Sequence, residues 1–281
     1  MKFASSDSDY RSSRYVICGV MFDGTSSFRT GSRWAPEAIR KGSYNFEPYD
    51  YDYDLCEPSV YDMGDVEFGN VDDMIAELQP TIFGIINDGK VPITLGGEHS
   101  ITLPCLKAFV QEADTTAVIF DAHLDFKENY LGNKCGHASV AWNVFELSIP
   151  LVQIGVRSGS KIEYERARDG SALYTMSQIR DEGIGVIIDE VVRSLKTDTI
   201  YLSIDVDVVD PAFAPGVGNP EPYGLTPLEL RTAIRRLAPL VGGFDMVEIT
   251  PDYDLGISAI LGAKLTLDFI FAHANAHQNL I

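Results

Sequence analysis

Residues 117–125 read Ala-Val-Ile-Phe-Asp-Ala-His-Leu-Asp, so a short apolar run leads directly into two carboxylates and an imidazole. Residues 201–207 repeat the pattern as Tyr-Leu-Ser-Ile-Asp-Val-Asp. A nearly continuous apolar run of this length suits a strand that is covered on both faces, as the strands of a parallel sheet are. Because ligands of open parallel sheets bind beyond the carboxyl ends of the strands, the polar residues after both runs are candidate functional residues.

Comparable apolar runs recur along the chain at 15–20, 91–95, 151–156 and 243–249. Stretches with helical spacing lie between the runs, at 103–110, 140–147, 185–195, 227–237 and 257–271. Alternating strands and helices predict right-handed βαβ crossovers and an α/β fold, in which helices cover both faces of a mostly parallel sheet. The stretch 71–88 also has helical spacing, but Pro80 in its middle predicts two short helices or one bent helix.

The length and composition fit one domain. The chain has 281 residues, of which 45% are hydrophobic, so we expect a single domain over 1–281 with a flexible polar segment at 1–14. That segment lacks the apolar stretch of a signal peptide, and we expect no later apolar run to cross a bilayer, so the expected location is the cytoplasm. The four cysteines form no Cys-x-x-Cys pair and are expected to be free thiols.

The net charge of −19, from 41 acidic and 22 basic side chains, argues against nucleic acid or an anionic membrane as a partner. It would favour the approach of a cationic small molecule, although most of the excess is assigned to a solubilising surface. The alternating Tyr-Asp run at 49–54 is interpreted as part of that solvated surface and not as a metal site.

The aspartates after the two apolar runs indicate a metal site. Where the chain is still extended, alternate residues face one side, so Asp121, His123 and Asp125 can converge, as can Asp205 and Asp207. Several buried carboxylates would repel one another unless neutralised. Since neither motif contains a Lys or Arg, a divalent cation is the natural counter-charge.

A third motif adds to this group. Residues 96–100 read Gly-Gly-Glu-His-Ser after the run at 91–95, and the two glycines allow a tight turn that presents His99. Two imidazoles and four carboxylates without a thiolate suit Mn²⁺ better than a cysteine-based zinc site. Six ligands, some of them bridging, could hold two ions about 3.5–4 Å apart with a shared water. A lone Asp-x-Asp is commonplace, but the three motifs together make a chance origin improbable.

Four further residues need assignment. His137 could be an ordinary loop histidine, but its position downstream of Asp125 favours proton transfer. Glu248, at the end of an apolar strand, requires a positive partner, either a core arginine or a planar cation in the site. His273 and His277 are spaced for a metal pair, yet we favour a structural role at a helix C-terminus, where the helix dipole stabilises a charged histidine.

These motifs together resemble the agmatinase branch of the arginase and agmatinase (ureohydrolase) family. The resemblance covers most of the chain, with matching segments at 23–25, 31–40, 96–100, 121–125, 203–207 and 210–216. It implies a three-layer α/β/α sandwich around an eight-stranded parallel sheet, two manganese ions, and a homo-oligomer, commonly a trimer or hexamer. The reaction it implies is hydrolysis of a guanidinium compound to urea and an amine by a metal-bridging hydroxide.

The resemblance also assigns roles to residues. One ion would be held by His99, Asp121, Asp125 and Asp205, and the other by Asp121, His123, Asp205 and Asp207. Glu248 would pair with the guanidinium, Asp125 would hydrogen-bond the nucleophile, and His137 would move protons to the departing amine.

The expected substrate is agmatine, which would give putrescine for polyamine biosynthesis. Residues 126–134 are shorter than the arginase loop that grips the α-carboxylate and α-amine of arginine, and Glu128 is hypothesised to favour a distal ammonium. Val217, Asn219 and Tyr223 depart from common family residues near the expected mouth, so N1-aminopropylagmatine, 4-guanidinobutyrate and arginine remain open. A single-zinc deacetylase-like amidohydrolase is the alternative from another class, and metal content would separate the two.

Overall fold

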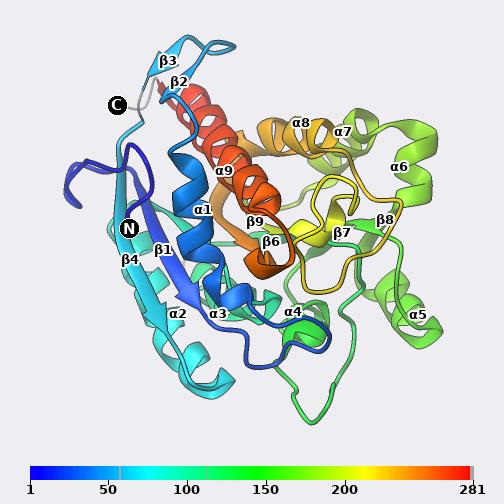
Figure 1. Ribbon diagram of the computed structural model, residues 1–281. Coiled ribbons are helices and arrows are strands. Elements are labelled where there is room, and N and C mark those ends of the chain that lie inside the picture. Colours follow the sequence, from blue (N-terminus) through cyan, green and yellow to red (C-terminus); the bar gives the residue numbers. More distant parts are fainter. Residues whose placement is uncertain (57, 112, 279–281) are drawn as a thin grey trace.

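The computed structural model describes residues 1–56, 58–111 and 113–278, and its centre is an eight-stranded sheet with helices on both faces (Figure 1). The strand order is β4-β1-β5-β10-β9-β6-β7-β8, and every neighbouring pair is parallel. The strands are β1 (Tyr15–Met21), β4 (Val60–Glu67), β5 (Val91–Leu95), β6 (Thr115–Phe120), β7 (Leu151–Val156), β8 (Ala172–Thr175), β9 (Thr199–Asp205) and β10 (Val241–Val247). A small antiparallel pair, β2 (Tyr49–Asp50) and β3 (Leu55–Cys56), lies outside this sheet.

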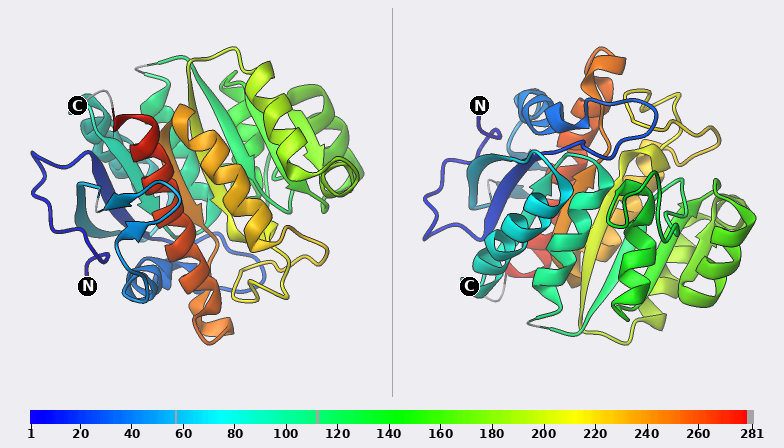
Figure 2. Two further views of the ribbon diagram at one scale, coloured as in Figure 1. Left: turned by 90° about the horizontal axis from the view of Figure 1, so that it is seen from above. Right: turned by 90° about the horizontal axis from the view of Figure 1, so that it is seen from below.

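The helices form two layers, one on each face of the sheet (Figure 2). The first layer contains α1 (Ala35–Ser43), α6 (Met176–Glu182), α7 (Ile184–Ser194), α8 (Pro227–Leu237) and α9 (Ile257–Ala276). The second contains α2 (Val71–Asn87), α3 (Thr102–Phe109), α4 (Val140–Glu146) and α5 (Lys161–Gly170). Each layer buries its own hydrophobic cluster against the sheet, which confirms the three-layer α/β/α architecture and the eight parallel strands.

Helix α2 is continuous although Pro80 lies inside it, so of the two predicted alternatives, two short helices or one bent helix, the first is wrong. Pro80 is on the exposed side, whereas Met74, Leu78 and Ile82 are buried at four-residue spacing. The Asn70 side chain caps the first turn by accepting from the backbone N–H of Asp73. Burial of the apolar face, together with this cap, outweighs the roughly 3 kcal/mol cost of an internal proline.

The acidic run at 49–54 is not simply a solvated surface, and that interpretation is wrong for Asp50. Asp50 is buried and pairs with Arg235, which also reaches Asp268 at 2.8 Å. Asp52 accepts from Arg231 at 2.9 Å. These ion pairs tie the β2–β3 pair to α8 and α9, because burying a carboxylate requires a matched cation.

Two expectations concern the ends of the chain. Segment 1–14, expected to be flexible, contacts the fold at Phe3, which is buried and donates its backbone N–H to Asp62 at 2.7 Å. Helix α9 is long and apolar enough to cross a bilayer by length and composition, but 72% of its apolar window is buried inside the protein. It therefore serves as a core helix of the first layer.

His273 has a structural role, as expected, but for a different reason. Its ring is 3% exposed and its Nδ1 lies 2.9 Å from the Tyr15 hydroxyl. Burial, with the nearby His277 and Arg14, lowers the pKa of His273 to about 3, so the ring is neutral near pH 7. The helix-dipole explanation needs a charged ring, so the hydrogen bond to Tyr15 replaces it. All four cysteines are free thiols, as predicted.

Candidate metal centre

The candidate residues come from four adjacent strands at the centre of the sheet. In the order β5-β10-β9-β6, the carboxyl ends lead to His99, Glu248, Asp205 and Asp121. Because parallel strands end at the same edge, residues more than a hundred positions apart in sequence meet here.

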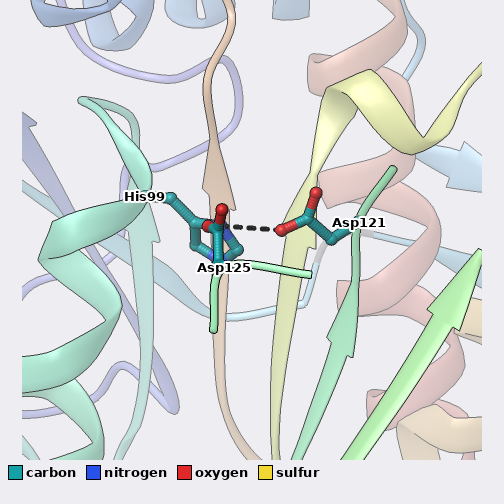
Figure 3. Close-up of side chains that lie close together, drawn as sticks. All are labelled: His99, Asp121 and Asp125. Atoms are coloured by element: carbon teal, nitrogen blue, oxygen red, sulfur yellow. Dashed lines mark ion pairs between the residues drawn. The ribbon is translucent and has the colours of Figure 1, made fainter. Parts of the chain in front are cut away.

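His99, Asp121 and Asp125 form the first ligand group. His99 Nδ1 lies 3.2 Å from Asp121 Oδ2 and 3.2 Å from Asp125 Oδ2. Figure 3 shows the His99 ring and the Asp121 carboxylate facing each other, with Asp125 beside the ring. All three residues are buried, and His99 Nδ1 and Asp121 Oδ2 have no hydrogen-bond partner among the described residues. Buried polar atoms without hydrogen-bond partners are rare, so these two atoms are candidates for coordinating a metal ion.

Asp121, His123 and Asp207 form the second group. His123 Nδ1 lies 2.9 Å from Asp207 Oδ2 and 3.5 Å from Asp121 Oδ1. The two groups therefore share Asp121, whose Oδ2 faces His99 and whose Oδ1 faces His123. A carboxylate used from both oxygens is the arrangement expected of a bridge between two ions.

Asp205 lies beside both groups. Its Oδ2 is 3.4 Å from His99 Nδ1, and its Oδ1 accepts from the backbone N–H of Asp207 at 2.9 Å. Burial, with the carboxylates of Asp207, Asp121 and Glu248, raises the pKa of Asp205 well above its ordinary value. The same repulsion would be removed by a cation, since nearby positive charge favours the ionised carboxylate.

The donor set fits divalent ions. Ligand atoms at right angles around an ion with bonds of about 2.1 Å lie about 3 Å from one another. Three separations within the two groups, 3.2, 3.2 and 2.9 Å, are close to this value, and the His123–Asp121 separation of 3.5 Å is longer. Oxygen and imidazole donors without thiolates suit hard or borderline ions such as Mn²⁺.

The turn after β5 places His99 through left-handed backbone, which glycine adopts without strain. Gly96 and Gly97 have φ of 70° and 72°, and a Cβ on Gly97 would lie 2.8 Å from the Phe22 carbonyl oxygen. Two residues with side chains are also left-handed, Asp125 at φ 48° and Glu248 at φ 67°. Such conformations cost about 1–3 kcal/mol each and cluster at functional sites. Asp125 therefore meets Asp121 through a turn, not through the extended chain that the sequence suggested.

Glu248 follows β10 directly and lines a cavity of about 170 Å³ next to the two ligand groups. Its Oε1 accepts from the backbone N–H of His99 at 2.8 Å. Burial and the nearby Glu98 carboxylate raise the pKa of Glu248 to about 8. No described Lys or Arg pairs with Glu248, so the core-arginine alternative is not supported. A bound cation would favour the ionised carboxylate and lower this pKa.

His137 lines the same cavity and is held through Thr25, which the sequence reasoning did not single out. The Thr25 hydroxyl donates to Glu98, so its oxygen accepts from His137 Nδ1 at 3.2 Å. In that tautomer Nε2 carries no proton and can accept from the Ser27 hydroxyl at 3.2 Å. Burial lowers the pKa of His137, so the ring is neutral and able to take up a proton.

Glu128 does not line the cavity. It is 62% exposed and its carboxylate pairs with Arg166 at 3.8 Å. Lys127 and Glu163 line the cavity instead, together with Tyr130 and Asn219. Neighbouring residues in a chain point in different directions, and the sequence alone did not show which of the two charged side chains faces inward.

Arg157 holds the loop that carries Asn219. Its guanidinium donates to the backbone oxygens of Asp207 and Glu221, each at 2.7 Å, and to that of Pro222 at 2.9 Å. These bonds link a ligand-bearing segment to the cavity wall. Nothing in the sequence marked Arg157, because its partners are carbonyl groups of a distant loop.

Comparison with known proteins agrees with this geometry, since the Arginase family model matches residues 13–272. The chain belongs to the arginase family. An agmatinase of Pyrococcus horikoshii is 37% identical over 264 residues, covering 92% of this chain and 91% of that protein. An N(1)-aminopropylagmatine ureohydrolase of Thermococcus kodakarensis is 35% identical, covering 93% of this chain and 91% of that protein.

The agmatine ureohydrolase of Thermoplasma volcanium has a similar solved structure, with a TM-score of 0.94 and 38% identity. The match covers 100% of this chain and 96% of that chain. This arginase-family protein is therefore a ureohydrolase with agmatinase relatives. Its candidate metal ligands are the members of the two groups that share Asp121.

Proposed function

We propose that this protein is an agmatinase that uses two manganese ions to hydrolyse agmatine to putrescine and urea. The observation that carries the proposal is the pair of ligand groups sharing Asp121, next to a buried Glu248 that pairs with no Lys or Arg in the described part of the chain. A shared carboxylate favours two ions over the single zinc of a deacetylase-like amidohydrolase.

The side chains suggest how the reaction proceeds. The two ligand groups, His99, Asp121 and Asp125 with Asp121, His123 and Asp207, would hold the ions, which when bound would supply Lewis acidity and lower the pKa of water. The buried carboxylate of Glu248 would pair with the guanidinium and orient its carbon. Asp125 would accept a hydrogen bond from the attacking water, and His137 would carry a proton to the departing amine.

The choice of agmatine rests on the relatives and on the cavity. Relatives named for agmatine and for N(1)-aminopropylagmatine are 37% and 35% identical, which is too close to separate the two substrates. The cavity of about 170 Å³ is smaller than the roughly 300–1,000 Å³ of drug-sized pockets. It therefore favours the shorter guanidine.

Urea release tests the substrate. Manganese-loaded protein would be offered agmatine, N1-aminopropylagmatine, arginine and 4-guanidinobutyrate in parallel, with chelator-treated protein as the control. We expect agmatine to have the highest kcat/KM, and about two manganese ions per chain. A higher kcat/KM for another guanidine would make that compound the substrate. No urea from any of the four, together with one zinc ion per chain, would favour the deacetylase-like alternative.

We also propose that the protein acts in the cytoplasm as a homo-oligomer, a trimer or hexamer, as the family resemblance implies. Light scattering after gel filtration would give three or six times the chain mass of 30.9 kDa. A mass near 31 kDa would contradict the oligomer.

A further inference from the structure

The cavity wall contains a lysine, although the proposed substrate carries two cationic groups. Lys127 is the one Lys or Arg among the described residues that line it. Its side chain is 36% exposed, and Nζ lies 3.2 Å from Glu163 Oε1 and 4.8 Å from the centre of the Tyr130 ring. An unpaired ammonium at this place would repel a guanidine that bears a second positive group.

Glu163 is fixed in place by its helix. It is the third residue of α5, where its Oε2 accepts from the backbone N–H of Ser160 at 3.0 Å and its own N–H donates to the Ser160 hydroxyl at 3.3 Å. Its side chain is 5% exposed, and it also lines the cavity. Burial opposes its ionisation, but the Ser160 hydrogen bonds and Lys127 outweigh burial and lower the pKa of Glu163.

The two side chains therefore form a pair without net charge in the cavity wall. The capping box holds the carboxylate, and the carboxylate and the Tyr130 ring hold the ammonium. A neutral wall admits a second cation on the substrate without attracting a carboxylate, whereas either charge alone would select the opposite charge on the substrate.

We propose that Glu163 is a specificity-determining residue that acts through Lys127: by neutralising the lysine, it lets the cavity accept a guanidine with a second cationic group. Glu163 is here a positioning residue and not a catalytic one. The inference rests on the proposed function. It adds that the substrate carries a second cation and that Glu163 and Lys127 together determine this preference.

The test compares two glutamates of α5. Glu163→Gln keeps the helix cap, since glutamine also serves at this position, but removes the charge that neutralises Lys127. Glu165→Gln removes the same charge two residues along, where the side chain is 53% exposed and pairs with Lys161. The readout is the ratio of kcat/KM for agmatine to kcat/KM for 4-guanidinobutyrate, which differ in the charge of the distal group.

We expect Glu163→Gln to lower this ratio by about tenfold, the order produced by a unit charge at a partly screened site. Glu165→Gln should keep it within twofold of the unmodified protein. Lys127→Met should raise the ratio, and the double variant Lys127→Met/Glu163→Gln should return it to within threefold, because the wall is neutral again. If Glu163→Gln does not fold, the rise in Lys127→Met carries the test.

An unchanged ratio in Glu163→Gln or in Lys127→Met overturns the inference. So does a double variant with a ratio as low as that of Glu163→Gln, because the effect would then not pass through Lys127. These outcomes leave the proposed function standing, since they require an active unmodified protein. Absence of urea from every guanidine in the unmodified protein would instead reject the proposed function, and the inference with it.

Discussion

The two oxygens of Asp121 face different imidazoles, His99 and His123, so this carboxylate belongs to both ligand groups. His123 and Asp207 belong to one group only. At the scale of single residues, we therefore expect metal binding to depend more strongly on Asp121 than on a ligand that belongs to one group.

Loss of Asp121 should therefore affect both ions and loss of His123 only one. We expect Asp121→Asn to reduce bound manganese from about two per chain towards zero, and His123→Ala to reduce it towards one. Urea production should fall at least a hundredfold in both variants. Elemental analysis after gel filtration measures the stoichiometry, with the exposed Asp189→Asn as a control that retains both ions. Equal manganese content in the two variants would contradict the shared role of Asp121.

Thr25 connects Glu98 to His137 and fixes which ring nitrogen is free. We expect Thr25→Val to lower kcat by about tenfold to a hundredfold, because a misplaced proton-transfer group loses much of its typical contribution. KM and manganese content should change less than threefold. Thr25→Ser keeps the hydroxyl and should restore most of the rate. A serine variant as slow as the valine variant would rule out the hydrogen-bond explanation.

At the scale of elements, the turn between β5 and the short helix at His99–Ile101 decides where the first ligand lies. The Gly97 carbonyl accepts from the backbone N–H of Glu248 at 2.9 Å, and the N–H of Glu98 donates to the Phe22 oxygen at 2.8 Å. The turn therefore positions His99, Glu98 and Glu248 together, and its geometry requires glycine.

Gly97→Ala should lower the free energy of unfolding by about 3 kcal/mol, because alanine is strained at φ 72° and its Cβ would meet the Phe22 backbone. Gly84→Ala is the matched control: Gly84 lies in the exposed part of α2 with nothing within 4 Å of an added Cβ. It should raise stability by about 0.5–1 kcal/mol. Urea denaturation measures both, and similar losses in the two variants would contradict the special role of Gly97.

At the scale of the whole molecule, buried ionisable groups whose pKa differs between the folded and the unfolded chain make stability depend on pH. Arg40 and Asp62 are fully buried and pair at 2.7 Å, and His273 is buried between β1 and the end of α9. Burial would raise the pKa of Asp62, but bonds from Arg40 and two backbone N–H groups outweigh it and lower that pKa. The contribution of Asp62 is therefore present above its ordinary pKa of 3.8 and is lost as the pH falls further.

His273 should make stability fall at milder acidity. Its pKa drops from 6.5 to about 3 in the folded protein, so between these values the unfolded chain binds a proton that the folded chain does not. Stability therefore decreases as the pH falls through this window, by up to about 1.4 kcal/mol per pH unit. Urea denaturation of chelator-treated protein between pH 7 and 4 should show a smaller slope for His273→Gln than for the unmodified chain. Identical slopes would contradict this assignment.

The sequence by itself determined the layer architecture and the metal-ligand candidates. Buried parallel strands such as 151–156 are continuous apolar runs, and the helical spacing at 227–237 matches the bounds of α8 in the structure. Asp121, His123 and Asp205 were also identifiable from sequence, because carboxylates and imidazoles directly after apolar strands are chemically conspicuous. These features depend on neighbours within a few residues, which the sequence displays directly.

Only the tertiary structure decided which charged side chains face the cavity and which pair elsewhere. It turned Lys127 inward and Glu128 outward to Arg166, placed Thr25 between Glu98 and His137, and buried Asp50 against Arg235. Each of these results depends on partners that are distant in sequence and on backbone turns with positive φ. Local periodicity carries no information about such partners, because their positions follow from how the strands and helices pack together.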